Sequence, residues 1–182
     1  MGYYSGKLMG QIAVTGGNWW DLGGTITSCI AAYQPKGASS YDNSKINLAN
    51  PGTHNAVNGT AYPTWSATNG WSFNRSLSQF LSTTVMTNVG MTWIVRIANG
   101  NVSSVCVFGA VRDESPWDGM CFQSNLGNGK YQYTNGSYVT FTGTKANGIF
   151  AAAGGDVYEN GTKVANLTNT GNPNLPIYLG CL

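Results

Sequence analysis

The densest group of reactive side chains lies in the segment RDESPWDG, residues 112–119. Asp113, Glu114 and Asp118 surround Trp117, and they are three of the seven acidic residues in the chain. Their oxygens could hold Ca²⁺, or they could hydrogen-bond a sugar ring that stacks on Trp117. The spacing matches no known calcium-binding loop, and a solvated turn with Trp117 folded back onto the core is the alternative. The carboxylates and the indole together make a ligand-binding loop the first expectation here, and the solvated turn stays open beside it. No cofactor is required, and Ca²⁺ is the one candidate ion.

Residues suited to catalysis are few. The only glutamates are Glu114 and Glu159, and the only histidine is His54. Retaining glycoside hydrolysis needs two carboxyl groups about 5–5.5 Å apart, and Glu159 stands beside an Asn-Gly turn, where a solvent-exposed position is expected. His54 has no evident Asp or Ser partner, and a loop histidine is usually exposed. The sequence therefore predicts no catalytic residues and a protein that is not an enzyme.

The elements that would position these residues are strands. Short alternating or apolar runs bounded by Gly, Asn and Pro recur along the chain, and helical periodicity is hard to find. Residues 91–98, MTWIVRIA, alternate with Trp93 and Val95 on one face, and a hairpin with the next run, SVCVFGA at 104–110, is expected. The small-residue run GIFAAAGG, residues 148–155, would lie under a neighbouring layer. This pattern predicts an all-β chain.

Two Asn-Gly pairs give the strongest hairpin signals. A type I′ turn needs positive φ at both central residues, which favours Asn-Gly between alternating runs. The pair at 135–136 predicts a hairpin with Tyr133 opposite Tyr138, and the pair at 160–161 predicts a second hairpin.

Composition excludes several classes of function. Only 9% of the 182 residues are charged and the net charge is +2, without the basic stripe that follows phosphates, so no nucleic-acid partner is expected. No apolar run is long enough to cross a membrane, and the apolar stretch at the start is too short for a secretory signal. Synthesis in a cytoplasm is the resulting expectation.

The cysteines do not have zinc-binding spacing. They lie at Cys29, Cys106, Cys121 and Cys181. Disulfides Cys106–Cys121 and Cys29–Cys181 are conceivable, and buried free thiols are the alternative.

The chain divides into an N-terminal arm, residues 1–28, and one domain, residues 29–182. In the arm, Gly pairs flank Trp19 and Trp20, which either dock onto a neighbouring molecule or cap the core of the domain itself. The polar, turn-rich region 38–71 is expected to form a long ordered loop system before the core strands.

Five segments taken in order carry a family resemblance. They are IAAYQPKGASSYDNSKINLANPGTHNA, GWSFNRSLSQFLSTT, MTWIVRI, VYENGTKVA and LPIYLGCL. Together they resemble the laminin-G-like, concanavalin A-like jelly rolls often encoded by bacteriophages, over roughly residues 29–182. The resemblance implies two antiparallel sheets packed face to face, with loops at one rim free to bind sugars or protein.

The sequence departs from that family in two places. Phe73-Asn74-Arg75 lacks the Asp and Gly of the family's Phe-Asp-Gly, whereas the family's Tyr-x-Asn-Gly hairpin is intact at residues 158–161. The family also includes glucan hydrolases, but their Glu-x-Asp-x-x-Glu strand is absent from this sequence.

The last strand raises the question of assembly. In the family a further strand follows the segment that corresponds to Ile177, Tyr178 and Leu179, and it runs beside the first strand of the domain. The domain is therefore expected to lack its last strand, so that Ile177–Gly180 would pair with residues before Ile30 or with another chain. A sequence shorter than its gene product is the other explanation.

These observations predict a non-enzymatic structural protein of a phage virion: a capsid decoration, head fibre or tail fibre component with a glycan- or surface-binding role. Its partners would be other virion proteins, copies of itself or a surface polysaccharide, and its location the virion. The alternative is a stand-alone carbohydrate-binding module or adhesin, located outside the cell. A glucan hydrolase is a third and weaker hypothesis.

Overall fold

The computed structural model describes residues 29–88, 90–98, 105–114, 117–124, 130–135, 138–142, 147–168 and 174–180. Its regular elements in chain order are α1 (Tyr41–Ser44), β1 (Val57–Asn58), β2 (Thr64–Ser66), β3 (Gly70–Ser72), a 3-10 turn (Arg75–Leu77), β4 (Phe80–Met86), β5 (Trp93–Ile97), β6 (Val105–Glu114), β7 (Trp117–Ser124), β8 (Lys130–Asn135), β9 (Tyr138–Thr142), β10 (Gly148–Ala153), β11 (Asp156–Glu159), β12 (Thr162–Asn166) and β13 (Pro176–Gly180). The prediction of an all-β chain is confirmed. No helix within the described ranges has the length and apolar character needed to cross a membrane.

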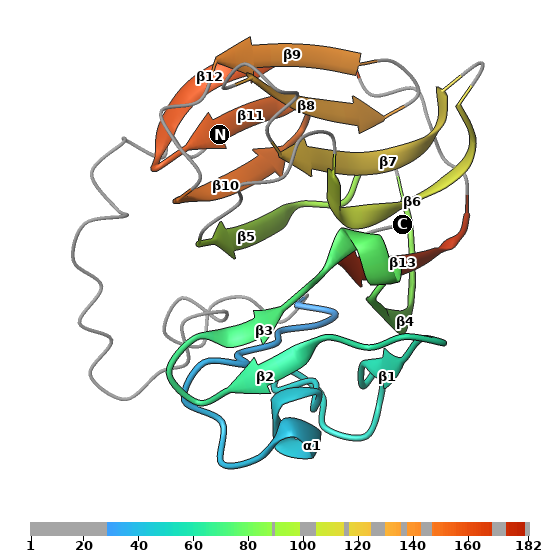
Figure 1. The fold of residues 1–182 in the computed structure, drawn as a ribbon. Helices are drawn as coiled ribbons and strands as arrows, with labels where there is room; N and C mark the ends of the chain where they lie inside the picture. Colours follow the sequence, from blue (N-terminus) through green and yellow to red (C-terminus); the bar gives the residue numbers. More distant parts are fainter. Residues whose placement is uncertain are drawn as a thin grey trace.

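The strands form three antiparallel sheets. The largest has the order β1-β4-β13-β6-β7-β8-β9, the second has the order β12-β11-β10-β5, and β2 and β3 form a small third sheet. The two larger sheets make a β-sandwich, which occupies the upper part of Figure 1. Below it lie α1, β2 and β3 together with β1, the edge strand of the large sheet, and we call this smaller unit, residues 29–79, the lobe.

The core of the sandwich is an aromatic cluster centred on Phe122, whose side chain is fully buried. Phe122 comes from the seven-stranded sheet, and it lies with ring centroids 5.0 Å from Phe150 and 5.2 Å from Trp93, both in the four-stranded sheet. Trp93 also meets Phe108 edge to face at 4.6 Å. Burial of these rings between the sheets holds the two layers together.

The alternation in β5 is confirmed, but its expected partner is wrong. Trp93 is buried and Val95 half-buried, whereas Ile94 and Arg96 are exposed. Yet β5 pairs with β10 in the four-stranded sheet, while β6 lies in the seven-stranded sheet. Both strands present one apolar face to the same core, so their alternation is equally compatible with one shared sheet or with opposite sheets.

The two Asn-Gly hairpins form, with one change of register. Asn160 has φ 49° and Gly161 has φ 81°, as a type I′ turn requires, and β11 pairs with β12 across them. Strands β8 and β9 also pair, but Tyr133 lies opposite Val139 rather than Tyr138. The connection between these strands is one residue longer than a two-residue turn, and the pairing shifts accordingly.

The small-residue run expected to lie under a neighbouring layer forms β10. It lies between β11 and β5, and its Ala152 is 1% exposed. The Phe150 ring of the same strand packs against Phe122 of the other sheet, so β10 is covered by that sheet.

The prediction that β13 lacks a partner within the domain is wrong. β13 pairs with β4 on one side and with β6 on the other. Ile177 is in the core, Leu179 packs against the core, and the Tyr178 ring lies 5.5 Å from Phe80. In the large sheet β13 lies between β4 and β6, two strands that are far from it in the sequence.

The lobe confirms the expected ordered loop system and adds short elements to it. Its centre is Asn47, which is fully buried. The Asn47 Oδ1 accepts hydrogen bonds from the amides of Ala32 and Ala49, and its Nδ2 donates to the carbonyls of Ile30 and Thr53. One side chain thus joins three loop segments and satisfies all of its own hydrogen-bonding capacity.

Candidate ligand-binding groove

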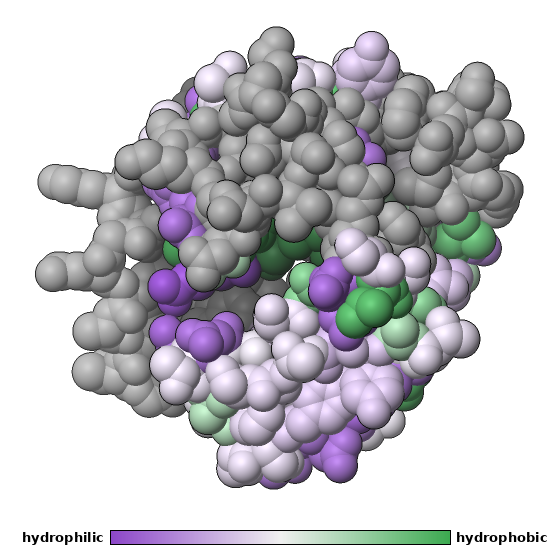
Figure 2. All heavy atoms as spheres, viewed as in Figure 1, coloured by the Kyte–Doolittle hydropathy of each residue, from purple (hydrophilic) through white to green (hydrophobic). Residues whose placement is uncertain are grey.

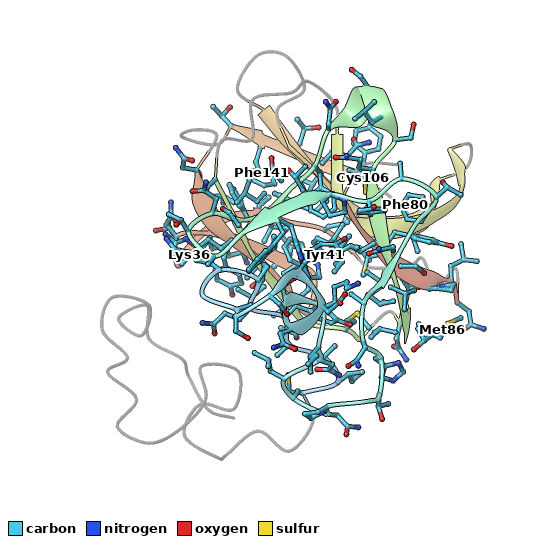
Figure 3. All side chains as sticks on the ribbon, turned by 60° about the horizontal axis from the view of Figure 1, so that its bottom comes forward. Lys36, Tyr41, Phe80, Met86, Cys106 and Phe141 are labelled. Carbon is cyan, nitrogen blue, oxygen red and sulfur yellow. The ribbon has the colours of Figure 1, made fainter. Side chains whose placement is uncertain are left out.

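An open groove of about 630 Å³ crosses the lobe. It is lined by residues from three segments of the chain: Tyr41 of α1, the run Ala61–Trp65, and Leu77 with Gln79 near the 3-10 turn. Figure 3 turns the lobe toward the reader and shows the Tyr41 side chain beside α1, with Phe80 and Met86 at the two ends of β4. A smaller hollow of about 370 Å³ lies at the edge of the sandwich beside Arg96 and Asn160.

Tyr41 is held at one side of the groove by α1. Ser40 caps this short helix, because its Oγ accepts a hydrogen bond from the Asn43 amide at 3.1 Å. The Tyr41 hydroxyl donates to Asn58 Oδ1 at 2.7 Å, and the Lys45 ammonium lies 4.5 Å from the ring centroid. The ring is therefore fixed at both its edge and one face.

Tyr62 provides the exposed ring of the groove. Its side chain is 54% exposed, and its ring centroid lies 6.0 Å from that of Tyr41 with an interplanar angle of 34°. The neighbouring Pro63 is among the fully buried residues and anchors the segment that carries Tyr62. Two tilted aromatic rings thus form a continuous apolar surface.

Trp65 lies on β2 and is fixed by the loops beneath it. Its Nε1 donates to the Pro35 carbonyl at 2.8 Å. Across the small sheet it pairs with Trp71, whose own Nε1 donates to Ser44 Oγ at 2.8 Å. The indole N–H groups are thus satisfied inside the lobe, so the aromatic surfaces are what this part of the groove presents.

The far end of the groove is built on Asn74. Its Oδ1 accepts the Ser76 amide at 3.0 Å, and its own amide donates to Oε1 of the buried Gln79 at 2.8 Å. This turn presents Leu77 with 57% of its side chain exposed. Asn74 therefore shapes the turn at the position where the family resemblance expects an Asp.

The groove carries no fixed charge in its lining. None of the eight lining residues is Asp, Glu, Lys, Arg or His. Burial, and then the neighbouring Tyr62 and Asp42, raise the pKa of Tyr41, so its hydroxyl is protonated at neutral pH. The nearby Lys45 is paired with Asp42 at 2.9 Å.

The surface around the lobe agrees with this neutral character. On the face shown in Figure 2, the region where Figure 1 places α1, β2 and β3 is covered mostly by residues of intermediate hydropathy. Such a surface suits an uncharged ligand that presents both apolar and hydroxyl groups.

The acidic segment that was predicted to bind a ligand lies at the end of the long β6–β7 hairpin. Asp113 and Glu114 end β6, and Trp117 and Asp118 begin β7. In the backbone register Asp113 is opposite Asp118 and Glu114 is opposite Trp117. The hairpin brings these four positions together, but it lies outside the lobe that carries the groove.

The other candidate residues also differ from expectation. Glu159 was predicted to be exposed, but it is 6% exposed, because the alternation in β11 places it on the same inward face as Val157. His54 is half-buried, and its Nδ1 lies 2.7 Å from Thr84 Oγ1. Its carbonyl accepts a hydrogen bond from Tyr33, whose pKa burial raises to about 12.

The cysteines that the structure describes are free thiols, which excludes the Cys106–Cys121 disulfide: Cys29 is half-buried, and Cys106 and Cys121 are buried. Cys181 lies outside the described residues, as do Trp19 and Trp20 of the N-terminal arm. Within the described part of the chain, no three His, Cys, Asp or Glu side chains come together to hold a metal ion.

Sequence reasoning did not identify the groove. Its aromatic residues lie in the polar region 38–71, where no periodicity marks them as exposed or buried. The available signal was the presence of Tyr41, Tyr62 and Trp65 in a region otherwise poor in apolar residues. Large rings in such a region either anchor loops or form a surface, and here they do both.

Neither a comparison with models of known protein families nor a comparison with curated proteins finds a match for this chain.

Proposed function

We propose that the chain is a non-enzymatic structural protein of a bacteriophage virion with a surface-binding role. The observation that supports this proposal is the open, uncharged groove of the lobe, lined by the fixed rings of Tyr41, Tyr62 and Trp65. Such a site can hold a ligand without offering a nucleophile or an acid. Capsid decoration, head fibre and tail fibre components are the classes that this role fits.

The engagement of the described carboxylates supports a binding role over catalysis. Asp42 pairs with Lys45 and Asp156 pairs with Lys163 at 2.6 Å, while Glu159 lies in the interior. Glycoside hydrolysis needs two carboxyl groups that face one substrate, and no carboxylate lines the groove.

A laminin-G-like, concanavalin A-like jelly roll is part of the same proposal. Two observations support it: two antiparallel sheets over one core, and the intact Tyr158–Gly161 hairpin. The phage assignment rests on the sequence resemblance over residues 29–182.

A second candidate, a stand-alone carbohydrate-binding module or adhesin, is favoured by one observation. β13 finds both of its partners within the chain, so the sandwich needs no strand from a neighbour.

Association with particles distinguishes them. Particles would be purified by density-gradient centrifugation from a culture producing the phage that encodes the chain, and then probed with antibody against it. A virion protein is expected to co-sediment with the particles in a fixed ratio to the major capsid protein. Its presence only in the fraction free of particles would overturn the virion assignment and support the stand-alone module.

A further inference from the structure

We infer that the lobe groove is a binding site for an uncharged polysaccharide, with the Tyr62 ring as the principal stacking surface. The inference rests on the proposed surface-binding role and places the ligand on the lobe rather than on the β6–β7 hairpin. Four properties of the groove lead to this ligand: its open shape, its exposed apolar surfaces, its rigidity and its lack of charge.

The shape favours a polymer over an enclosed small molecule. The groove holds about 630 Å³ and is open to solvent. Sites for small molecules usually bury most of the ligand in a closed cleft. An extended chain can lie across an open groove and continue past both of its ends.

The exposed surfaces match the faces of sugar rings. Tyr62 is 54% exposed and Leu77 is 57% exposed, and the tilted ring of Tyr41 extends the surface from Tyr62. A pyranose ring has one face of C–H groups that packs on an aromatic ring, and hydroxyl groups around its edge. Thr64 and Gln79, which also line the groove, provide polar atoms beside the rings.

Two of the groove's rings, those of Tyr41 and Trp65, are held by hydrogen bonds before any ligand binds. The hydroxyl of Tyr41 is bound to Asn58, and the N–H of Trp65 is bound to the Pro35 carbonyl. Binding on preorganised surfaces loses less conformational entropy, which matters for a ligand that makes weak, repeated contacts.

The electrostatics select against charged polymers. An acidic polysaccharide would require free cationic side chains, yet no Lys or Arg lines the groove. Lys45, which contacts the face of the Tyr41 ring, is already paired with Asp42.

A proline-rich peptide is the other ligand that docks on aromatic grooves. Such peptides take a hydrogen bond from a groove Trp through a backbone carbonyl. The corresponding donor in this groove, Nε1 of Trp65, is already used by the Pro35 carbonyl. The observations therefore favour the sugar over the peptide.

Affinity electrophoresis of the full chain tests the inference. The gels would contain neutral polysaccharides (dextran, mixed-linkage β-glucan and galactomannan) or acidic alginate, and decaproline would be tested separately by titration calorimetry. The variants are Tyr62→Ala, Tyr62→Phe, which keeps the ring, and Tyr138→Ala, a matched control because Tyr138 on β9 is also 54% exposed. Thermal unfolding of each variant would show that the fold is intact.

The expected result is retardation by at least one neutral polysaccharide, weakened about tenfold in Kd by Tyr62→Ala and less than about threefold by Tyr62→Phe. Tyr138→Ala should bind as the unmodified chain does. The inference is overturned if no neutral polymer retards the chain, if Tyr62→Ala binds equally well, or if only alginate or decaproline binds. Particle association is measured in a separate experiment. If the chain co-sediments with particles but binds none of the three neutral polymers, this inference fails and the proposed virion role stands.

Discussion

The ring of Phe73 fills the space beside Gly180 so completely that a Cβ atom on Gly180 would overlap Cδ1 of Phe73. Phe73 follows the last strand of the lobe, and Gly180 ends β13 in the large sheet of the sandwich. A second contact of the same kind lies nearby, where the Phe80 ring fills the space beside Gly59. Besides the pairing of β1 with β4, two aromatic rings that each require a glycine opposite thus pack the lobe against the sandwich.

Gly180→Ala should destabilise the protein by about 2–4 kcal/mol. The methyl group would have to displace Phe73, and the residue has φ 95°, a conformation that L-residues rarely adopt. Urea denaturation would measure the loss as a lower midpoint. Gly37→Ala is the matched control, because Gly37 also has positive φ, at 85°, but has no atom within 4 Å of the added Cβ. A loss of about 1 kcal/mol is expected there from backbone strain alone, and equal losses in the two variants would contradict the packing argument.

Asn47→Asp should destabilise the lobe by about 3 kcal/mol. The substitution replaces the Nδ2 donor with an acceptor facing the carbonyls of Ile30 and Thr53, inside a fully buried site. Thermal unfolding at neutral pH would detect the effect. Asn69→Asp, at an exposed position in the turn after β2, should change stability by less than about 0.5 kcal/mol. If both substitutions had the same small effect, Asn47 would not be the organising residue of the lobe.

The sequence was sufficient to predict local turns and strands, but it was insufficient to predict which strands pair with one another. The Asn160-Gly161 turn could be predicted because its chemistry is contained in two adjacent residues. The pairing of β13 with β4 and β6 could not, because it joins residues far apart in the chain, and alternation does not say which strand lies alongside. Glu159 was predicted to be exposed because it stands next to the Asn-Gly turn. It is buried because it lies on the same inward face of β11 as Val157.

The groove could not be predicted from the sequence because the lobe has no regular pattern of apolar residues. No period relates Tyr41, Tyr62 and Trp65, since they lie on a helix, a loop and a strand that come together only in the folded lobe. The candidate residues found from the sequence, Asp113 to Asp118, were conspicuous because they are clustered in sequence. Their cluster is present in the backbone register, and their role in ligand binding stays a prediction.

The buried thiols should resist modification in the native state. Cys106 Sγ lies 3.2 Å from the Phe108 carbonyl, and both Cys106 and Cys121 are buried between neighbouring strands of the large sheet. Labelling with a maleimide followed by peptide mass spectrometry should show rapid modification of these two residues only in denaturant. Cys29 is half-buried and should react faster than either, so it provides an internal control. Recovery of a Cys106–Cys121 disulfide from protein purified without reductant would contradict the free thiols.

The ion pair of Asp156 and Lys163 should make the second Asn-Gly hairpin sensitive to acid. The Lys163 ammonium, followed by the Asn166 amide, lowers the pKa of Asp156 below its ordinary value of 3.8. Because the folded-state pKa is the lower one, the stabilisation is fully present above about pH 4 and disappears as the pH falls through the folded-state pKa. Asp156→Asn should therefore have a lower urea midpoint than the unmodified chain at pH 7, and the difference should shrink toward zero near pH 2. Lys163→Met removes the partner of Asp156 and should show the same dependence of the urea midpoint on pH. If the difference in midpoint between Asp156→Asn and the unmodified chain persisted unchanged at acid pH, the effect of Asp156 would not come from its charge.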